Sequence, residues 1–277
     1  MGLFFPEEKE YDLPVRKVGF ARYREVLEAN WKGFFMVGFL TLLFFIPFAG
    51  GMVYAILSKS ALIALLSGVV GGIFAGPGLA CMYDNVLRRL RNDHSDWWTC
   101  WKKALRQNLR ASLLPGIVQC VFLGMVIFSG ALMLWGAAPA SLGTLAILAL
   151  GMVLMTMVLT IWWVQTVLFT QSPLIRLKNT VFFILFHPGR VLGAALIRVV
   201  WWLILFLFLP WTAFVVPVLG IWYVLFLSVF LIYRDLDEAF SIEAQIREAF
   251  PGSLPEDEPL RLPGRVSPGL IRQYYVV

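Results

Sequence analysis

The sequence predicts an all-α polytopic membrane protein, with about six transmembrane helices arranged as three hairpins. Of its 277 residues, 60% are hydrophobic and only 14% are charged, whereas soluble domains carry about 25% charged residues. The mean hydropathy of +0.78 points the same way. The apolar runs are about 20 residues long, which is the length that a helix rising 1.5 Å per residue needs to cross roughly 30 Å of hydrocarbon.

The apolar runs divide the chain into six predicted spans separated by alternating long and short connections. These spans are residues 33–57, 61–82, 112–135, 142–170, 191–209 and 212–233. They belong to a membrane domain of residues 20–235, which follows a flexible segment, 1–19, and precedes a cytoplasmic tail, 236–277. The tail begins with an acidic amphipathic stretch and then becomes rich in proline.

The polar stretch before the first span, residues 20–32, has the periodicity of an amphipathic helix. Phe20, Tyr23 and Trp31 fall on one side of it, and charged residues fall elsewhere. Such a helix lies in the membrane interface with its apolar face down. Pro47 is expected to bend the span that follows, because proline removes a backbone donor.

The second span meets Gly76-Pro77-Gly78 after about 16 residues. Either the helix kinks there and continues to about Met82, or it ends and a surface helix begins. Beyond this point apolar residues recur with a helical period as far as Leu90, and a second amphipathic helix follows with Ser95 as its N-cap. The basic residues of both helices are predicted to form an interfacial surface: Arg88, Arg89, Arg91, Lys102, Lys103, Arg106 and Arg110.

The distribution of Lys and Arg predicts the orientation of the chain. Six basic residues precede the first span, seven lie between spans two and three, three between spans four and five, and five after span six. Only Lys59 lies in a loop on the opposite side. Cytoplasmic loops of membrane proteins are enriched in basic residues. We therefore expect both termini and the amphipathic helices on the cytoplasmic side of a bacterial cell membrane.

Several classes of function are disfavoured by what the sequence lacks. All 17 Asp and Glu residues lie outside the predicted spans, whereas ion-coupled transporters rely on acidic residues within them. No Walker, HExxH or GxSxG motif is present. We therefore expect neither an enzyme nor a cofactor, and the chain has no nucleic-acid-binding motif. His94 could join Asp93, Asp96 and Cys100 around a metal, but capping of the following helix is the favoured interpretation.

A few polar and aromatic residues inside the spans are candidates for a hinge or a pore lining. Arg198 either extends to the headgroups or contacts a buried ligand or a lipid phosphate. The other side chains either bond and pack between helices or line a polar or carbohydrate path. Gly76-Pro77-Gly78 is either a hinge or a static kink. The candidates are Gly76, Pro77, Gly78, Gln119, Gln165, Arg198, Trp162 and Trp201.

Three short stretches resemble the YesL family of bacterial membrane proteins. They are Asn30-Trp31, Gly76-Pro77 with Ala80 and the basic helix to Arg91, and the run from Trp101 to Asn108. The resemblance covers about residues 20–235. It implies a setting in carbohydrate utilisation beside sugar transporters of the ABC class. It supplies no biochemical role and no site residues.

Two functions are compatible with these observations. The first is an accessory membrane component linked to carbohydrate uptake or utilisation, which contacts a sugar transporter complex or another membrane protein. Its contact surfaces would be the basic stretch 84–110 and the acidic tail helix 235–250. The alternative is a channel or facilitator for a small neutral solute.

Overall fold

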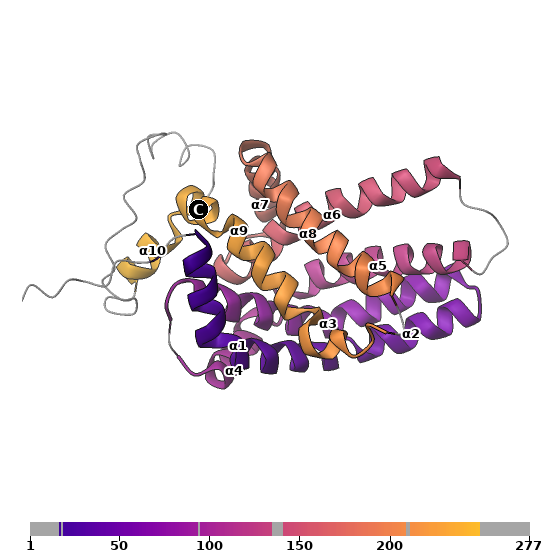
Figure 1. The fold of residues 1–277 in the computed structure, drawn as a ribbon, viewed down its shortest axis with the longest axis horizontal. Coiled ribbons are helices and arrows are strands. Elements are labelled where there is room, and N and C mark those ends of the chain that lie inside the picture. The colour runs from indigo at the N-terminus through magenta and orange to yellow at the C-terminus, as the bar shows by residue number, and fades with distance from the viewer. Residues whose placement is uncertain (1–16, 18, 94, 135–140, 209–210, 250–277) are drawn as a thin grey trace, which may run out of the picture.

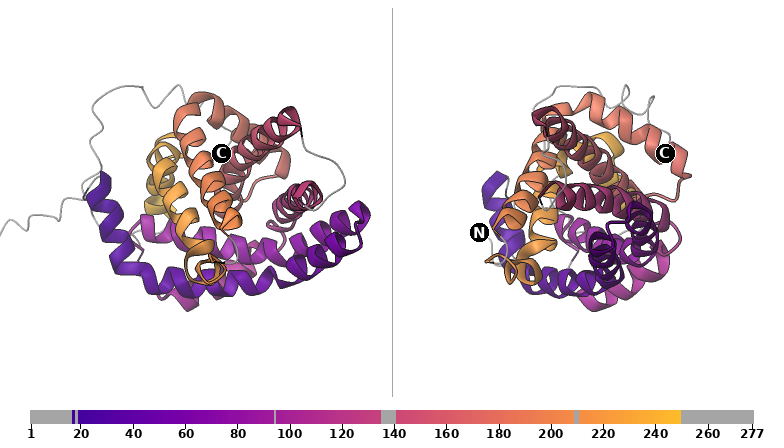
Figure 2. Two further views of the ribbon diagram at one scale, coloured as in Figure 1. Left: turned by 45° about the vertical axis from the view of Figure 1, so that its right-hand side comes forward. Right: turned by 90° about the vertical axis from the view of Figure 1, so that its right-hand side faces the viewer.

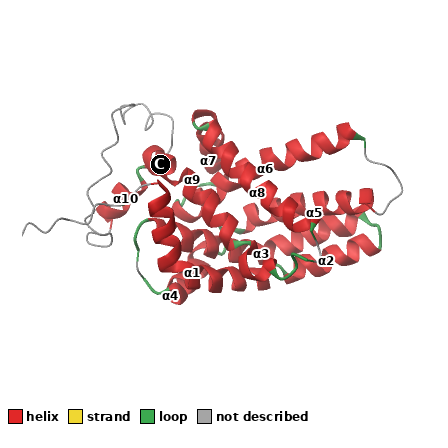
Figure 3. Cartoon of the chain, in the orientation of Figure 1, coloured by secondary structure: helices red, strands yellow, loops and turns green. Residues whose placement is uncertain are grey.

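The computed structural model describes residues 17, 19–93, 95–134, 141–208 and 211–249, which are almost entirely helical and contain no strand (Figures 1 and 3). The elements are α1 (Gly19–Phe44), α2 (Ile46–Leu57), α3 (Ala61–Leu90), α4 (Trp97–Asn108), α5 (Leu113–Leu134), α6 (Leu142–Leu168), α7 (Pro173–Phe186), α8 (Pro188–Leu207), η1 (Val216–Gly220), α9 (Trp222–Phe240) and α10 (Ile242–Ala249).

Six helical segments are long and apolar enough to cross a membrane. They are α1, α3, α5, α6, α8 and the continuous stretch Val216–Phe240, which joins η1 to α9. Many of their large apolar side chains are exposed on the outside of the bundle, and contact with lipid makes such a surface favourable. The predicted class, an all-α polytopic membrane protein with six spans, is confirmed.

The helix that carries the first span begins before the predicted start of that span. The stretch 20–32 is part of α1, which continues from Gly19 to Phe44 without interruption, while α2 begins after Phe45. Pro47 lies in the first turn of α2, where its missing N–H costs least. The first turns of α1 stand at a steep angle to the rest of the helix (Figure 2).

The helix α3 is continuous for 30 residues, through Pro77, and ends at Leu90. Of the two alternatives that the sequence left open, the helix that continues through Gly76-Pro77-Gly78 is the one observed, and it runs past Met82 to Leu90. Residues 75–87 are all buried, so this half of α3 runs through the centre of the bundle. The helix α1 packs against this point of α3, where Thr41 Oγ1 lies 3.1 Å from the Gly78 carbonyl.

Glycines at this point let α3 and α5 pack with their backbones in contact. A Cβ on Gly76 would lie 2.6 Å from the Ser112 carbonyl oxygen, and one on Gly116 would lie 2.6 Å from the Gly76 Cα. Small residues commonly allow such close approach between membrane helices. Gly76 thus has a packing role, and the predicted hinge stays a prediction.

Two apolar clusters fill the bundle. The larger one joins α1, the second half of α3, α6 and α9, and its largest fully buried side chains include Trp163, Tyr83, Phe34 and Phe226. The smaller one lies between α2, α3 and α5 around Phe48 and Cys120. Although α5 and α6 are consecutive, α5 packs mainly on α3, and the first turns of α6 diverge from α5 (Figure 1).

Charged residues gather at one end of the bundle, which we call the charged end. It carries the start of α1, the end of α3, all of α4, the α7–α8 junction and the end of α9 with α10. The turn between α2 and α3 lies at the opposite end (Figure 1). The predicted limit of the membrane domain at residue 235 falls inside α9, which continues to Phe240.

Candidate functional site

Arg198 reaches into the core of the bundle from α8. Its Nε donates to Ser228 Oγ of α9 at 2.7 Å. Its Nη1 donates to Tyr83 Oη of α3 at 2.7 Å and to Thr160 Oγ1 of α6 at 3.1 Å. The guanidinium therefore joins four helices. Because its donors are directed at these core-facing hydroxyls, Arg198 does not extend towards the headgroups, the interpretation that the sequence favoured.

The partners of Arg198 are neutral hydroxyl groups. No described carboxylate forms an ion pair with Arg198. Its Nη2 is buried and has no hydrogen-bond partner among the described residues. An arginine at the centre of a membrane helix costs about 2.5–3.5 kcal/mol on insertion scales, and such residues usually mark functional positions. Arg198 with Tyr83, Thr160 and Ser228 is therefore a candidate site, which we call the arginine site.

The arginine site continues towards α5 through two aromatic rings. Tyr83 stacks on Trp163 with ring centroids 5.7 Å apart and an interplanar angle of 14°. Trp163 Nε1 in turn donates to Gln119 Oε1. The predicted candidate Gln119 thus bonds a neighbouring helix and is linked to the arginine site through Trp163.

The remaining predicted polar candidates contact other parts of the bundle. Gln165 is fully buried and shares a hydrogen bond of 3.1 Å with the Thr180 hydroxyl of α7. Trp201 Nε1 donates to the Gly220 carbonyl. Trp162 is 7% exposed, and its Nε1 has no hydrogen-bond partner among the described residues. None of these three bonds Arg198.

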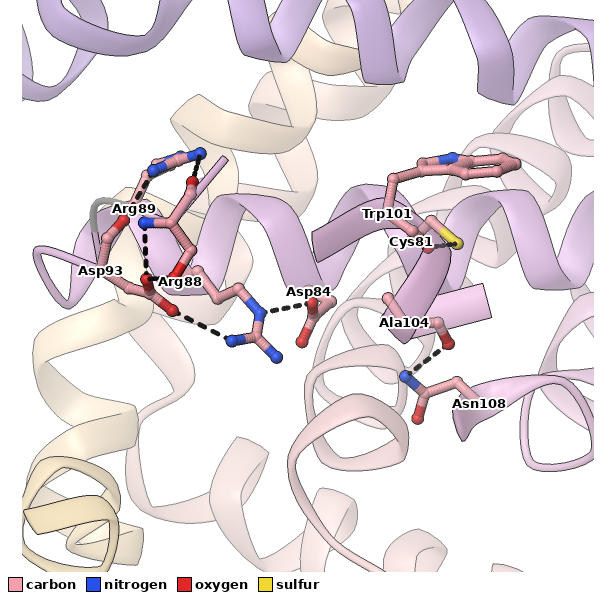
Figure 4. A network of polar contacts seen from close by, with 9 residues as sticks. Cys81, Asp84, Arg88, Arg89, Asp93, Trp101, Ala104 and Asn108 are labelled. Carbon is pink, nitrogen blue, oxygen red and sulfur yellow. Dashed lines mark hydrogen bonds and ion pairs between the residues drawn. The ribbon is translucent and has the colours of Figure 1, made fainter. Parts of the chain in front are cut away.

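A second polar network holds α3 and α4 together at the charged end (Figure 4). We call residues 84–110 the elbow. Arg88 lies between two carboxylates, Asp84 at 2.7 Å and Asp93 at 3.0 Å. Arg89 donates to the backbone carbonyls of Asp93 and Ser95, both at 2.6 Å. Both arginines therefore fix the turn that follows α3.

Asp93 is the acidic centre of this turn. Burial alone would raise its pKa, but hydrogen bonds from Ser95 and Arg88 outweigh that effect and lower the pKa from 3.8 to about 2. Asp96, rather than the predicted Ser95, is the N-cap of α4, because its Oδ2 accepts from the Thr99 N–H at 3.1 Å. His94 lies outside the described residues, which contain no cluster of three or more metal-ligand side chains.

The inner face of α4 packs on α3. Cys81 Sγ donates to the Trp101 carbonyl at 3.6 Å (Figure 4). Trp98 stacks on Trp101 with ring centroids 5.3 Å apart. The three cysteines, Cys81, Cys100 and Cys120, are buried and unpaired. Burial raises the pKa of the Cys100 thiol, which keeps this group protonated and unreactive.

The predicted basic surface divides into an inner and an outer part. Arg89 and Arg91 are each 8% exposed, so their assignment to an exposed surface is wrong, and Arg88 is largely enclosed by its two carboxylates. These arginines are buried because α3 runs into the core beyond Pro77. The outer part is exposed, and no described carboxylate forms an ion pair with it: Lys102, Lys103, Arg106 and Arg110.

The acidic tail stretch is shared between two helices. Asp235 of α9 pairs with Arg190 of α8, and Tyr233 donates to Glu243 of α10 at 2.8 Å. A cavity of about 540 Å³ at the start of α7 includes Gln171, Ser172 and Gln245 in its lining. None of the predicted site residues lines this cavity.

Sequence reasoning missed three members of the arginine site. Tyr83 lies within the stretch of helical apolar periodicity that ends at Leu90, and Thr160 and Ser228 carry no motif. The only signal in the sequence is Arg198 itself, because a charge within a span requires polar partners on other helices.

No family model matches this chain, and neither the curated proteins nor the solved structures contain a significant match. The resemblance to the YesL family therefore stays a prediction.

Proposed function

We propose that this chain is an accessory membrane component that binds another protein through its elbow, in the setting of carbohydrate uptake or utilisation. One observation carries the proposal. The elbow is held rigid by its inner arginines, while its outer face presents four basic side chains without acidic partners among the described residues. A rigid surface of one charge suits a partner with an acidic surface, because complementary potentials steer association.

The proposal places the elbow in the cytoplasm of a bacterium. The basic residues at the charged end and the rule that cytoplasmic loops are basic support this orientation. Both termini then lie in the cytoplasm. The partner class, a sugar transporter complex or another membrane protein, rests on the resemblance to the YesL family, and the proposal assigns the chain no catalytic role.

The alternative, a facilitator for a small neutral solute, receives no support from three of the side chains predicted to line its path. Gln119 and Gln165 bond groups of neighbouring helices. Trp201 bonds the backbone of η1. These contacts are those of interhelical packing.

Mild crosslinking in native membranes tests the proposal. The chain should be recovered in a complex with another membrane protein. The triple substitution Lys102→Glu, Lys103→Glu and Arg106→Glu should reduce that complex at least tenfold, because it reverses the charge of an exposed face without touching the core. Lys59→Glu, an exposed change at the opposite end, is the matched control and should leave the complex intact. Recovery of the chain only by itself would refute the proposal.

A further inference from the structure

We propose that the arginine site binds an oxyanion, a phosphate group in the first instance, within the membrane domain. This inference concerns a different part of the molecule from the elbow and does not depend on a partner there. The phosphate could belong to a lipid headgroup or to a soluble phosphate, and both share the chemistry that Arg198 recognises.

The charge balance of the site is the first argument. Two other buried or half-buried arginines, Arg22 and Arg88, are paired with carboxylates, whereas the buried Arg89 and Arg176 bond neutral oxygens near the polar ends of their helices. Arg198 has only hydroxyl partners among the described residues. A cation enclosed by protein is strongly stabilised by a nearby anion, because the interior screens charge weakly.

The allocation of hydrogen bonds is the second argument. The Ser228 hydroxyl donates to the Leu225 carbonyl at 2.9 Å, and the Thr160 hydroxyl donates to the Thr156 carbonyl at 2.7 Å. Both hydroxyl oxygens accept from Arg198. Nε and Nη1 are thereby occupied. The two N–H groups of Nη2 are buried without an acceptor, and a buried donor without an acceptor is costly.

The nature of these donors selects the ligand class. Guanidinium N–H groups form their strongest hydrogen bonds with the oxygens of carboxylates and phosphates. The site lies ten residues into α8, about 15 Å along its axis from Pro188. At this depth in the membrane, an unpaired positive charge is especially costly. An oxyanion that entered from the charged end and bound Nη2 would remove this cost.

Thermal unfolding in phosphatidylcholine nanodiscs, followed by tryptophan fluorescence, tests the proposal. At constant ionic strength, saturating inorganic phosphate should raise the unfolding midpoint of the wild-type chain by roughly 5 °C relative to chloride. Arg198→Gln should abolish this rise. Arg190→Gln on the same helix, and the elbow triple variant, should retain it because neither removes a donor of the site.

A second arm identifies a lipid as the source. In native mass spectrometry of chain purified from membranes that contain phosphatidylglycerol, the wild type should retain one such lipid that Arg198→Gln loses. Either a phosphate response or a retained anionic lipid that depends on Arg198 supports the proposal. Absence of both overturns it, as does an equal effect of chloride or an effect that persists in Arg198→Gln.

Arg198→Lys replaces the glutamine variant if the latter fails to fold. The ammonium group keeps the charge, but its three donors can at most replace those of Nε and Nη1, so none is left for the ligand. The dissociation constant for phosphate, or the wash-out rate of the retained lipid, should then rise roughly tenfold, as expected for the loss of one charge-assisted hydrogen bond. An unchanged value would overturn the proposal.

Discussion

Asp93 joins the two helices of the elbow through both its side chain and its backbone. The carboxylate accepts from Arg88 and Ser95, and the carbonyl accepts from Arg89. The Asp93 carboxylate therefore compensates Arg88, together with Asp84, while its backbone carbonyl satisfies a donor of Arg89. The rigidity of the elbow depends on this residue more than on any of the exposed lysines.

The first prediction at this scale concerns pH. Because folding lowers the pKa of Asp93 from 3.8 to about 2, its stabilising contribution is complete above about pH 4 and is lost as the pH falls towards 2. Hydrogen exchange of the turn 91–96 should therefore accelerate over that interval. Asp93→Asn should produce the same acceleration at neutral pH, with a loss of about 1–2 kcal/mol in local stability.

The control for this prediction is Glu28→Gln. Glu28 pairs with Arg24 at 2.6 Å on an exposed face of α1, and exposed pairs contribute at most about 1 kcal/mol. Exchange in the turn 91–96 should not respond to this change. An Asp93→Asn variant with wild-type exchange would show that the turn is held by other contacts.

The contact between helices α3 and α5 shows how tertiary packing can override a local helix-breaking signal. Proline and two glycines in sequence normally end a helix, yet α3 continues through them because Gly76 and Gly116 allow it to pack closely on α5. The side chains of residues 75–87 are then buried, including those of Asp84 and Asn85. The sequence of α3 left open whether the helix continues beyond Gly78, and packing on α5 explains why it does.

The glycine contact can be tested directly. Gly76→Ala and Gly116→Ala would each place a methyl group 2.6 Å from backbone atoms. The two backbones would have to separate, so each change should destabilise the chain by about 1–3 kcal/mol. Gly151→Ala in α6 is the matched control, because nothing lies within 4 Å of the added methyl group, and it should be neutral. Thermal unfolding in nanodiscs measures all three.

A wild-type unfolding midpoint for Gly76→Ala would contradict the close packing. Close packing would then not hold α3 fixed at Gly76, and the hypothesis of a hinge at Gly76-Pro77-Gly78 would gain support. The same measurement therefore separates a packing role from a moving joint.

The sequence predicted most helices and few of the contacts, for physical reasons. The lengths of the apolar runs around Leu123 and Leu150 predict the lengths of the corresponding helices, because the thickness of the bilayer sets the length of a membrane-spanning helix. Which faces meet depends on the arrangement of all the helices, so Tyr83 and Ser228 could not be paired with Arg198 in advance. Arg89 and Arg91 were expected on the surface because charged side chains usually lie there. The burial of Arg89 is explained by its hydrogen bonds to the backbone carbonyls of Asp93 and Ser95. No described contact explains the burial of Arg91 Nη1.

At the scale of the whole molecule, orientation is the property that most constrains function. Cysteine labelling in intact cells measures it. A Ser58→Cys chain should react with an impermeant maleimide from outside, and a Lys103→Cys chain should react only after the membrane is opened. Both positions are exposed, and the native cysteines are buried, so background labelling is low. The opposite pattern would move the elbow outside the cell and exclude a cytoplasmic partner.

The divergence of α5 and α6 has a consequence for the membrane that surrounds the chain. With 22 and 27 residues, these helices are about 33 and 40 Å long. In roughly 30 Å of hydrocarbon, the excess length is about 3 Å for α5 and about 10 Å for α6, so α6 is expected to tilt more than α5. Two consecutive helices with such different tilts cannot stay parallel, so the hairpin opens. Its aperture therefore depends on hydrophobic mismatch, so a change in bilayer thickness changes the angle between the two helices.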